Sequence, residues 1–423
     1  MKTYKKRIAD KMLAKKLAGK GAVLIEGPKW CGKTTTAEQI ANTIVYVSDP
    51  EKKKQYLELA QVSPKRILQG KTPVLIDEWQ LIPEIWDSIR FEVDHRDEFN
   101  QFVLTGSSVP PSTENIFHSG TGRFAWLTMR TMSLYESLES NGSVSLKDLF
   151  DGQKEINGRN ELTLEKVAFL ACRGGWPRSI DLDDDIALQQ AFDYYDAVVK
   201  SDISKVDGIS RNEERAKRLM SSLARNQGSQ CSFEVLCDDI NSNDYGVSEG
   251  TISSYIAALK KIFVIEDMPA WNPNLRSKTA IRTSDTRYFV DPSIATAALG
   301  LRPNDLLNDL NTFGFIFETL CVRDLRVYAD ALDGKVYHYR DKTGLECDAV
   351  IHLRNGSYGL IEIKLGGVSS INEAVTNLTK LANKIDINKM KSPSFLLVLT
   401  AIGDYAYRRE DGIYVVPIGC LKD

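Results

Sequence analysis

The sequence has few of the residues on which metal sites and disulfide-bonded folds depend. Its 423 residues include four histidines, none spaced with another as metal ligands, and seven scattered cysteines without a C-x-x-C pair. This pattern argues against a disulfide framework and against a zinc knuckle, and it fits a reducing compartment. We therefore expect a cytoplasmic protein.

Long apolar runs and a large charge excess are also missing. No apolar run approaches the length of a membrane-spanning helix, and the Lys-rich residues 1–20 lack the apolar core of a secretory signal, so we expect no membrane partner. The net charge is −3, so any contact with nucleic acid depends on a local patch. Residues 1–20 fit a solvated basic helix that packs on the core; an arm that contacts DNA is the alternative.

A glycine loop between a short apolar run (22–25) and a stretch without Gly or Pro (35–43) is the strongest motif. It reads G-x-x-x-x-G-K-T, and the predicted nucleotide-binding residues are Gly27, Pro28, Lys29, Trp30, Cys31, Gly32, Lys33, Thr34 and Thr35. Strand, loop and helix in this order form a phosphate-binding loop, in which backbone N–H groups and the helix N-terminus face phosphate oxygens. Lys33 can reach the β- and γ-phosphates and Thr34 can bind Mg²⁺. We therefore predict ATP and Mg²⁺ as ligands.

Two acidic residues end the apolar run 73–78. Asp77 is predicted to hold Mg²⁺, and Glu78 is predicted to orient and deprotonate the attacking water. The next apolar run, 101–104, ends in polar residues, of which Ser107 can contact the γ-phosphate; a simple turn is the alternative. A glycine-flanked loop, 118–123, ends in Arg123. This residue is either an arginine finger, in cis or in trans, or an ordinary surface arginine.

The middle of the chain changes character twice. Residues 137–160 are polar and predict a loop or insertion, and helices over 162–170 and 186–199 are expected to form a lid of the ATPase. From 216 to about 287 the pattern predicts three helices and a two-stranded wing, which resembles a winged helix-turn-helix. The third helix exposes mainly Ser, Glu249 and Thr251, with basic residues only at its end. Packing or weak backbone contact is therefore favoured over base reading.

Near the C-terminus, two strands over 346–353 and 358–365 carry acids and a lysine. Residues two apart share a face of a strand, so Glu362 lies with Lys364 and Glu346 lies with Asp348. A two-residue turn would put the two pairs on different faces, whereas a three-residue turn ending in Gly356 sets Asp348 opposite Glu362. We favour the three-residue turn because its last position suits glycine.

This arrangement resembles the PD-(D/E)XK nuclease site. The resemblance implies that Asp348 and Glu362 bind Mg²⁺, that Lys364 positions or deprotonates the attacking water, and that Glu318, on a predicted upstream helix, supports the metal shell. The chain departs from the pattern at Cys347, where a proline is common. A hairpin with salt-bridged acids and no activity is the alternative.

Together with Leu-Ile-Asp-Glu-Trp-Gln and Leu-Thr-Gly-Ser-Ser, the glycine loop resembles that of prokaryotic AAA-type (AAA+) ATPases with a nuclease-like C-terminal domain of unknown function. The resemblance implies an α/β protein with an AAA+ core (1–136), a helical lid region (137–215), a winged-helix-like domain (216–300) and a nuclease-fold domain (301–423). It also implies a homo-oligomer that acts on DNA. A scaffold or signalling ATPase that binds DNA or protein without cutting it is the alternative function.

Overall fold

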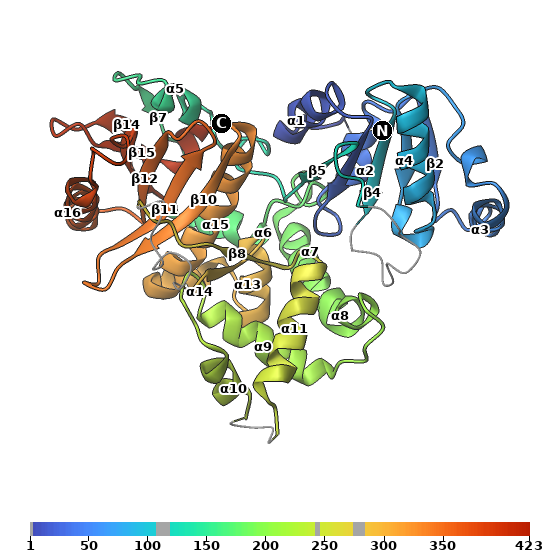
Figure 1. Cartoon of the computed structure of the whole chain (residues 1–423). Helices are drawn as coiled ribbons and strands as arrows, with labels where there is room; N and C mark the ends of the chain where they lie inside the picture. Colours follow the sequence, from blue (N-terminus) through green and yellow to red (C-terminus); the bar gives the residue numbers. More distant parts are fainter. Residues whose placement is uncertain (1–2, 107–118, 242–245, 274–283) are drawn as a thin grey trace. The chain divides into compact units, whose positions relative to one another are not determined.

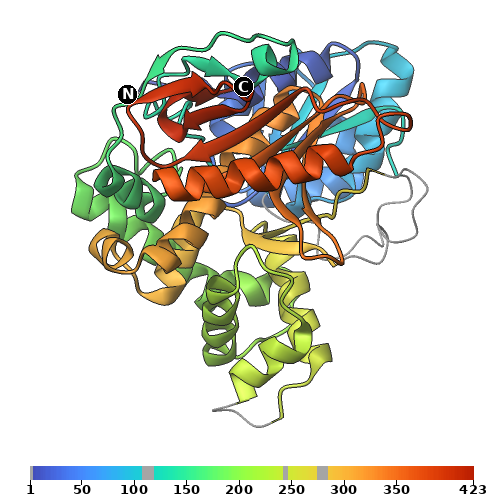
Figure 2. The ribbon, with the colours of Figure 1, turned by 90° about the vertical axis from the view of Figure 1, so that its left-hand side faces the viewer.

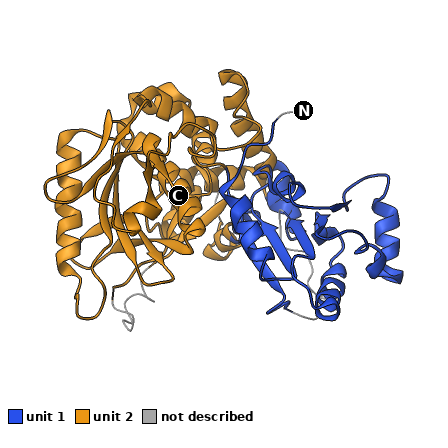
Figure 3. Ribbon diagram, turned by 90° about the horizontal axis from the view of Figure 1, so that it is seen from above, with its two compact units in different colours: residues 1–131, 200–211, 257–263 blue, residues 132–199, 212–256, 264–423 orange. Residues whose placement is uncertain are grey.

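The computed structural model describes residues 3–106, 119–241, 246–273 and 284–423. The chain divides into two compact units, coloured separately in Figure 3. Unit 1 comprises residues 1–131, 200–211 and 257–263, and unit 2 comprises residues 132–199, 212–256 and 264–423. Within the described residues, no helix is both long and apolar enough to cross a membrane.

Unit 1 is built on a five-stranded parallel sheet with the strand order β2-β3-β4-β1-β5 (Figure 1). The strands are β1 (Ala22–Glu26), β2 (Thr43–Tyr46), β3 (Val74–Asp77), β4 (Phe102–Gly106) and β5 (Phe124–Thr128). One face packs on α1 (Ile8–Leu17) and α2 (Lys33–Glu38), and the other packs on α3 (Lys53–Val62) and α4 (Ile85–Arg96). Short turns of helix are η1 (Pro64–Arg66), η2 (Trp79–Leu81) and α8 (Ile203–Lys205).

This topology explains why the strands of unit 1 read as continuous apolar runs. Helices cover both faces, so both sets of alternating side chains are buried. Strand β4 lies between β1 and β3, and all three run in the same direction. Their carboxyl ends therefore share one edge of the sheet, which is where open α/β sheets bind ligands.

Unit 2 contains a seven-stranded mixed sheet with the order β10-β11-β12-β13-β15-β14-β7. Its strands are β7 (Gly158–Arg159), β10 (Gly334–Arg340), β11 (Glu346–Leu353), β12 (Tyr358–Lys364), β13 (Phe395–Thr400), β14 (Tyr405–Arg408) and β15 (Tyr414–Pro417). The helix α16 (Val368–Lys384) crosses one face (Figure 2), and its buried side chains join Tyr358, Leu360 and Val398 in one cluster. The long helix α15 (Leu310–Ala331) packs against β10, β11 and β12.

The polar stretch 137–160 differs from the loop that its composition predicts. It contains β6 (Val144–Ser145), α5 (Leu146–Phe150) and β7, and both strands pair with the C-terminal part of the chain. Strand β6 lies parallel to β16 (Leu421–Lys422), which follows the turn η4 (Ile418–Cys420), and β7 lies antiparallel to β14. The polar side chains reflect short edge strands, which the sequence pattern did not reveal.

Five helices of the middle lie close to the predicted ranges: α6 (Leu164–Arg173), α7 (Asp184–Ala197), α9 (Glu213–Arg225), α10 (Phe233–Asn241) and α11 (Glu249–Lys261). The helices α13 (Pro292–Leu299) and α14 (Pro303–Asn308) were not predicted, and a π-helical turn lies at Val198–Asp202. Strands β8 (Ile265–Met268) and β9 (Thr286–Phe289) form an antiparallel pair. The three helices α9 to α11 and this strand pair occur in the expected order.

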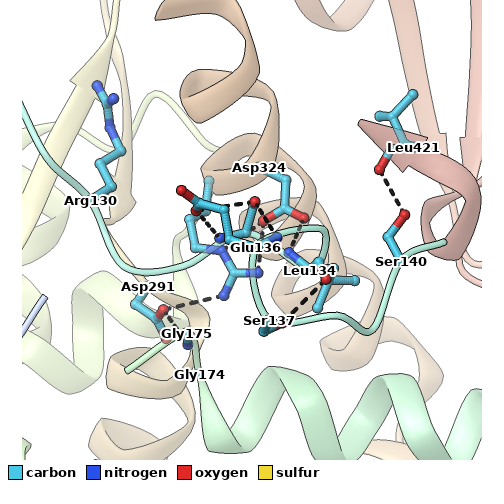
Figure 4. A network of polar contacts seen from close by, with 12 residues as sticks. Arg130, Leu134, Glu136, Ser137, Ser140, Gly174, Gly175, Asp291, Asp324 and Leu421 are labelled. Atoms are coloured by element: carbon cyan, nitrogen blue, oxygen red, sulfur yellow. Dashed lines mark hydrogen bonds and ion pairs between the residues drawn. The ribbon is translucent and has the colours of Figure 1, made fainter. Parts of the chain in front are cut away.

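A buried ion cluster joins distant segments of unit 2 (Figure 4). The side chain of Arg323 on α15 is 1% exposed and lies 3.3 Å from Asp291 Oδ2 and 2.7 Å from Asp324 Oδ1, both on fully buried side chains. Asp324 also accepts a hydrogen bond from the Leu134 backbone at 2.9 Å, and Asp291 accepts one from the Gly175 backbone at 2.9 Å. The cluster thus fixes α15 against the segments that precede and follow α6.

Candidate functional site

The glycine loop in unit 1 links β1 to α2 as the sequence predicts. Gly27 and Gly32 have φ values of +149° and +100°, and a Cβ atom on Gly27 would lie 2.0 Å from the Met129 carbonyl oxygen. Only glycine fits position 27 without a shift of the backbone. The Lys33 ammonium donates hydrogen bonds to the carbonyl oxygens of Gly27 and Pro28 at 2.8 and 2.7 Å. The lysine is therefore held within the loop that it serves.

The start of α2 and the carboxyl ends of β3 and β4 bring three oxygen-bearing side chains together. The Thr34 hydroxyl donates to Asp77 Oδ1 at 2.6 Å, and the Thr105 hydroxyl donates to the same oxygen at 2.6 Å. Asp77 and Thr105 are buried. The predicted pair Thr34 and Asp77 is thus in contact, whereas Thr105 was not predicted, although it begins the polar strand end that was singled out. Ser107, the predicted contact at that end, lies outside the described residues.

Glu78 follows β3 in a left-handed conformation. Its φ is +58° and its ψ is +44°, values that are uncommon for a residue other than glycine. Burial raises the pKa of its carboxyl group, and the charge of Asp77 raises it further. The Gln80 side-chain amide donates a hydrogen bond to Glu78 Oε2. A carboxylate with a raised pKa beside a phosphate-binding loop suits a general base.

The other predicted loop residues differ in their surroundings. Lys29 pairs with Asp202 at 2.6 Å, and Trp30 is 55% exposed with a φ of +66°. Cys31 is fully buried, and its Sγ lies 3.5 Å from the Met129 carbonyl oxygen. Cys31 can therefore offer a nucleotide its backbone N–H, while its thiol belongs to the core. Thr35 lies exposed in the first turn of α2.

Arg7 supports the glycine loop from outside and was not predicted. It precedes α1, is 6% exposed, and donates to the carbonyl oxygens of Cys31 and Arg130 at 2.7 and 2.8 Å. Nearby, the Tyr4 hydroxyl lies 2.9 Å from the Thr36 hydroxyl on α2. The Lys-rich composition of residues 1–20 predicts exposed basic side chains, so it gave no sign that Arg7 is buried. Within this stretch, α1 (Ile8–Leu17) is the predicted helix, and it packs on the core.

Arg123 is exposed and bound within its own unit. Its guanidinium group contacts both carboxylate oxygens of Asp94 on α4, at 2.7 and 3.2 Å, and the contact lowers the Asp94 pKa. Arg123 also donates to the Thr121 carbonyl oxygen at 3.1 Å. The arginine is thus held at the end of the glycine-flanked loop, with its side chain accessible to solvent.

In unit 2, the β11–β12 hairpin has the predicted three-residue turn. Ala349 pairs with Ile361, and the Leu353 backbone donates to the Ser357 carbonyl oxygen at 2.8 Å, so residues 354–356 form the loop. Gly356 has the expected left-handed conformation, with a φ of +84°. The predicted register is therefore confirmed, and it brings Asp348 beside the end of β12.

Lys364 lies between the two predicted acids. Its ammonium nitrogen is 3.2 Å from Asp348 Oδ2 and 2.8 Å from Glu362 Oε2, and the Ile363 backbone also donates to Asp348 at 2.7 Å. Burial raises the pKa of Glu362 to about 8, and the Asp348 charge adds to this effect more strongly than the Lys364 charge opposes it. Burial lowers the pKa of Lys364, but the two carboxylates more than compensate and raise it overall.

Glu318 on α15 lies close enough to Asp348, Glu362 and Lys364 for their charges to act on its carboxyl group. Burial is the main cause that raises the pKa of Glu318 to about 8, and the charge of Asp348 raises it further. A hydrogen bond from Tyr288 and the charge of Lys364 act in the opposite direction. The Tyr288 hydroxyl on β9 donates to Glu318 Oε1 at 2.6 Å. Gly228 packs directly against this contact. A Cβ atom at position 228 would lie 2.8 Å from Glu318 Oε1, so a larger residue there would displace the carboxyl group. The contact between Tyr288 and Glu318 was not predicted from the sequence.

The donor chemistry of this cluster suits a hard cation such as Mg²⁺. Asp348, Glu362 and Glu318 are all carboxyl groups, and magnesium prefers oxygen ligands. Within the described residues, Oε1 of Glu318 accepts the hydrogen bond from Tyr288, and its other carboxylate oxygen accepts none. As the side chains stand, however, no three acids, histidines or cysteines among the described residues form a preassembled metal site. The acids fit the ion by their chemistry.

Three protein-family models match the chain. Residues 19–138 match an AAA domain, residues 164–305 match a domain of unknown function, DUF8612, and residues 313–421 match another, DUF4143. No curated protein matches the chain.

Among solved structures, a Walker-type ATPase of Pyrococcus abyssi aligns with 13% identity and a TM-score of 0.43, over 69% of this chain and 94% of that one. A point variant of RuvB from Thermotoga maritima aligns with 19% identity and a TM-score of 0.27, over 62% and 88%. The match to residues 19–138 covers β1 to β5 with the glycine loop and both acids. Residues 19–138 are thus similar in sequence to the AAA domain of ATPases.

Proposed function

We propose that this protein hydrolyses ATP in its N-terminal domain and that the nucleotide state controls a Mg²⁺-dependent nuclease site in its C-terminal domain, with DNA as the substrate. The nuclease assignment is carried by the convergence of Asp348, Glu362 and Lys364 at the end of two adjacent strands. Glu318 adds a third carboxyl group from α15. This combination matches the PD-(D/E)XK pattern in residue type and spacing.

In the ATPase domain, each residue at the shared sheet edge has a role. Backbone N–H groups of the glycine loop bind the phosphates, and Lys33 exchanges its carbonyl partners for phosphate oxygens. Thr34 and Asp77 would hold the Mg²⁺ that accompanies ATP. Glu78 accepts a proton from the attacking water, and its raised pKa favours that transfer. Ser107 and Arg123 are further candidates for contact with the γ-phosphate, Arg123 in a homo-oligomer.

In the nuclease-like domain, Asp348 and Glu362 would hold Mg²⁺, with Glu318 in support. Bound Mg²⁺ lowers the pKa of a coordinated water and neutralises charge on a phosphodiester. Lys364 orients the attacking water and stabilises the developing negative charge. The winged-helix-like middle, α9 to α11 with β8 and β9, would contribute weak contacts to the DNA backbone.

One observation favours the alternative of an ATP-driven scaffold that binds DNA or protein without cutting it. The Lys364 ammonium group already pairs with Asp348 and Glu362, and burial raises the pKa of Glu362 and Glu318 to about 8. Burial thus favours the neutral form of both acids, and the Lys364 ammonium group offsets the charge of Asp348. A site in this condition can persist as a structural ion cluster.

The first experiment measures ATP hydrolysis with and without double-stranded, branched and single-stranded DNA. Wild type is compared with Lys33→Ala, with Glu362→Ala and with Lys54→Ala, an exposed lysine of the same unit. We expect loss of hydrolysis only in Lys33→Ala, and stimulation by DNA in wild type and Glu362→Ala. Equal hydrolysis by wild type and Lys33→Ala would show that the ATPase assignment is wrong.

A second assay follows DNA cleavage with ATP and Mg²⁺ or Mn²⁺. Asp348→Ala and Lys364→Ala should abolish it and leave ATP hydrolysis intact, while Lys380→Ala, an exposed lysine on α16, should have no effect. If wild type cuts none of the DNA forms with either metal, the nuclease assignment is wrong and the scaffold alternative stands.

A further inference from the structure

One buried polar atom near the ATPase site has no partner. The Gln80 side chain is 8% exposed, and its carbonyl oxygen, Oε1, has no hydrogen bond anywhere in the described part of the chain. An amide oxygen that is buried without a partner destabilises the fold, because it has lost the hydrogen bonds that it makes to water in the unfolded chain. Such an atom needs an explanation, and an absent hydrogen-bond donor is the simplest one.

The backbone after β3 holds Gln80 against Glu78. The strand ends at Asp77, Glu78 turns the chain through its left-handed conformation, and the η2 turn brings Gln80 back beside it. The Gln80 amide nitrogen then donates to Glu78 Oε2. Because an ionised carboxylate only accepts hydrogen bonds, the amide nitrogen must face it, and the oxygen is the atom left over.

The unpartnered oxygen lies at the sheet edge where the phosphate-binding loop begins. A Cβ atom on Gly106, the last residue of β4, would lie 2.6 Å from Gln80 Oε1. Strand β4 neighbours β1, which leads into the glycine loop, and Thr105 beside Gly106 contacts Asp77. The oxygen is thus close to the residues that would surround the γ-phosphate.

We propose that Gln80 is a second water-orienting residue of the ATPase site. Its N–H group fixes Glu78, and its free oxygen accepts a hydrogen bond from the attacking water. The water oxygen bonds to the γ-phosphorus, the water proton passes to the Glu78 carboxylate, and the bond between the γ-phosphorus and the bridging oxygen breaks with its electron pair leaving on ADP. Gln80 itself exchanges no proton. This inference rests on the proposed hydrolysis of ATP.

An amide suits this role because it offers a donor and an acceptor at once. A carboxylate at position 80 would repel Glu78, and an apolar side chain would leave both Glu78 and the water without a partner. A water that donates one hydrogen bond to Gln80 Oε1 and another to Glu78 is fixed in place and in orientation. Less entropy is then lost when it reaches the transition state. The effect should therefore fall on turnover and leave nucleotide binding almost unchanged.

The test compares wild type with Gln80→Leu and Gln80→Glu, and with Gln55→Leu as the matched control on the exposed side of α3. Gln80→Leu removes both hydrogen-bonding groups, and Gln80→Glu keeps the shape and loses the donor. We expect kcat to fall about 10- to 100-fold in both, as for loss of one group that acts in the transition state. The Kd for ATPγS should change by less than about twofold.

A second readout separates water positioning from general support of the fold. The complex of ADP with aluminium fluoride imitates the transferred phosphoryl group with a water in line. Both Gln80 variants should bind this complex at least about tenfold more weakly than wild type, since they lose a contact made only in the transition state. Gln55→Leu should match wild type in every measurement.

The outcomes distinguish this inference from the assignment on which it depends. Wild-type turnover in either Gln80 variant, or a loss of ATPγS binding equal to the loss of kcat, would overturn the role of Gln80 while ATP hydrolysis stands. If Gln80→Leu does not fold, Gln80→Glu decides the question. If wild type and Lys33→Ala show the same turnover, the proposed hydrolysis and the role of Gln80 fail together.

Discussion

Removing the cation from the buried ion cluster of unit 2 is expected to destabilise that unit. Arg323→Met removes the guanidinium group from between Asp291 and Asp324 and keeps most of the side-chain volume. All three side chains are at most 1% exposed, so no solvent can replace the lost cation without rearrangement. Breaking a buried ion pair by removing one partner costs about 3–5 kcal/mol, because the other charge stays buried.

The hydrogen bonds that remain set the expected value within that range. Asp324 keeps the Leu134 backbone N–H, and Asp291 keeps the N–H groups of Gly175 and Ser293. Hydrogen bonds to a charged group offset part of its desolvation. We therefore expect Arg323→Met to lower the free energy of unfolding by about 3 kcal/mol, the lower end of the range.

Urea unfolding at pH 7 measures this effect, with the two units followed separately because each can unfold in its own transition. The matched control is Lys147→Met, which breaks the exposed pair with Asp151 in the same unit and should have a much smaller effect because solvent screens this pair. The argument is refuted if Arg323→Met destabilises unit 2 by less than about 1 kcal/mol, or no more than the control does.

Three further changes test other contacts. Arg7→Ala should raise the KM for ATP about tenfold, because it removes a charge-assisted hydrogen bond to the Cys31 carbonyl oxygen in the glycine loop and another to Arg130. Lys6→Ala, which changes an exposed neighbour, should leave KM unchanged in steady-state assays. Tyr288→Phe should lower any DNA cleavage about 10-fold in an endpoint assay with ATP hydrolysis unchanged, since Glu318 loses its hydrogen bond; unchanged cleavage would contradict this. His338, which is buried beside the Ser284 carbonyl oxygen, has a pKa lowered mainly by burial. The imidazole of His338 binds a proton more readily in the unfolded chain than in the folded protein. At pH values below about 6.5, the free energy of unfolding should therefore decrease as the pH falls, by at most about 1.4 kcal/mol per pH unit. Urea titrations should show a smaller decrease for His338→Gln.

Local chemistry explains what could be predicted from the sequence. The glycine loop, the acids after β3 and the three-residue turn at Gly356 all depend on neighbours within a few positions, and the structure contains each of them. A glycine in the left-handed region and a period of two along a strand are enough to set the β11–β12 register. Asp348 and Lys364 could thus be placed together from the sequence.

The contacts that were missed join segments far apart in the chain. Arg7 and Arg130 are 123 positions apart, and Lys29 and Asp202 are 173 apart. Such pairs depend on how whole elements pack, which no local pattern encodes. The same holds for β7, whose two residues pair with β14 although their composition resembles that of a loop.

The contact between Tyr288 and Glu318 bears on how the proposed nuclease site must be studied. Tyr288 lies in the winged-helix-like stretch predicted for residues 216–300, and Glu318 lies in the stretch predicted for the nuclease fold. The strand pair β8 and β9 makes a second contact with α15. Arg326 on this helix lies 3.5 Å from Glu266 on β8 and stacks over the Tyr288 ring on β9. A fragment that begins at residue 301 would expose this face of α15 and leave Glu318 without its donor. An inactive fragment would therefore say nothing about the site, and only the full chain can decide whether Asp348, Glu362 and Lys364 cut DNA.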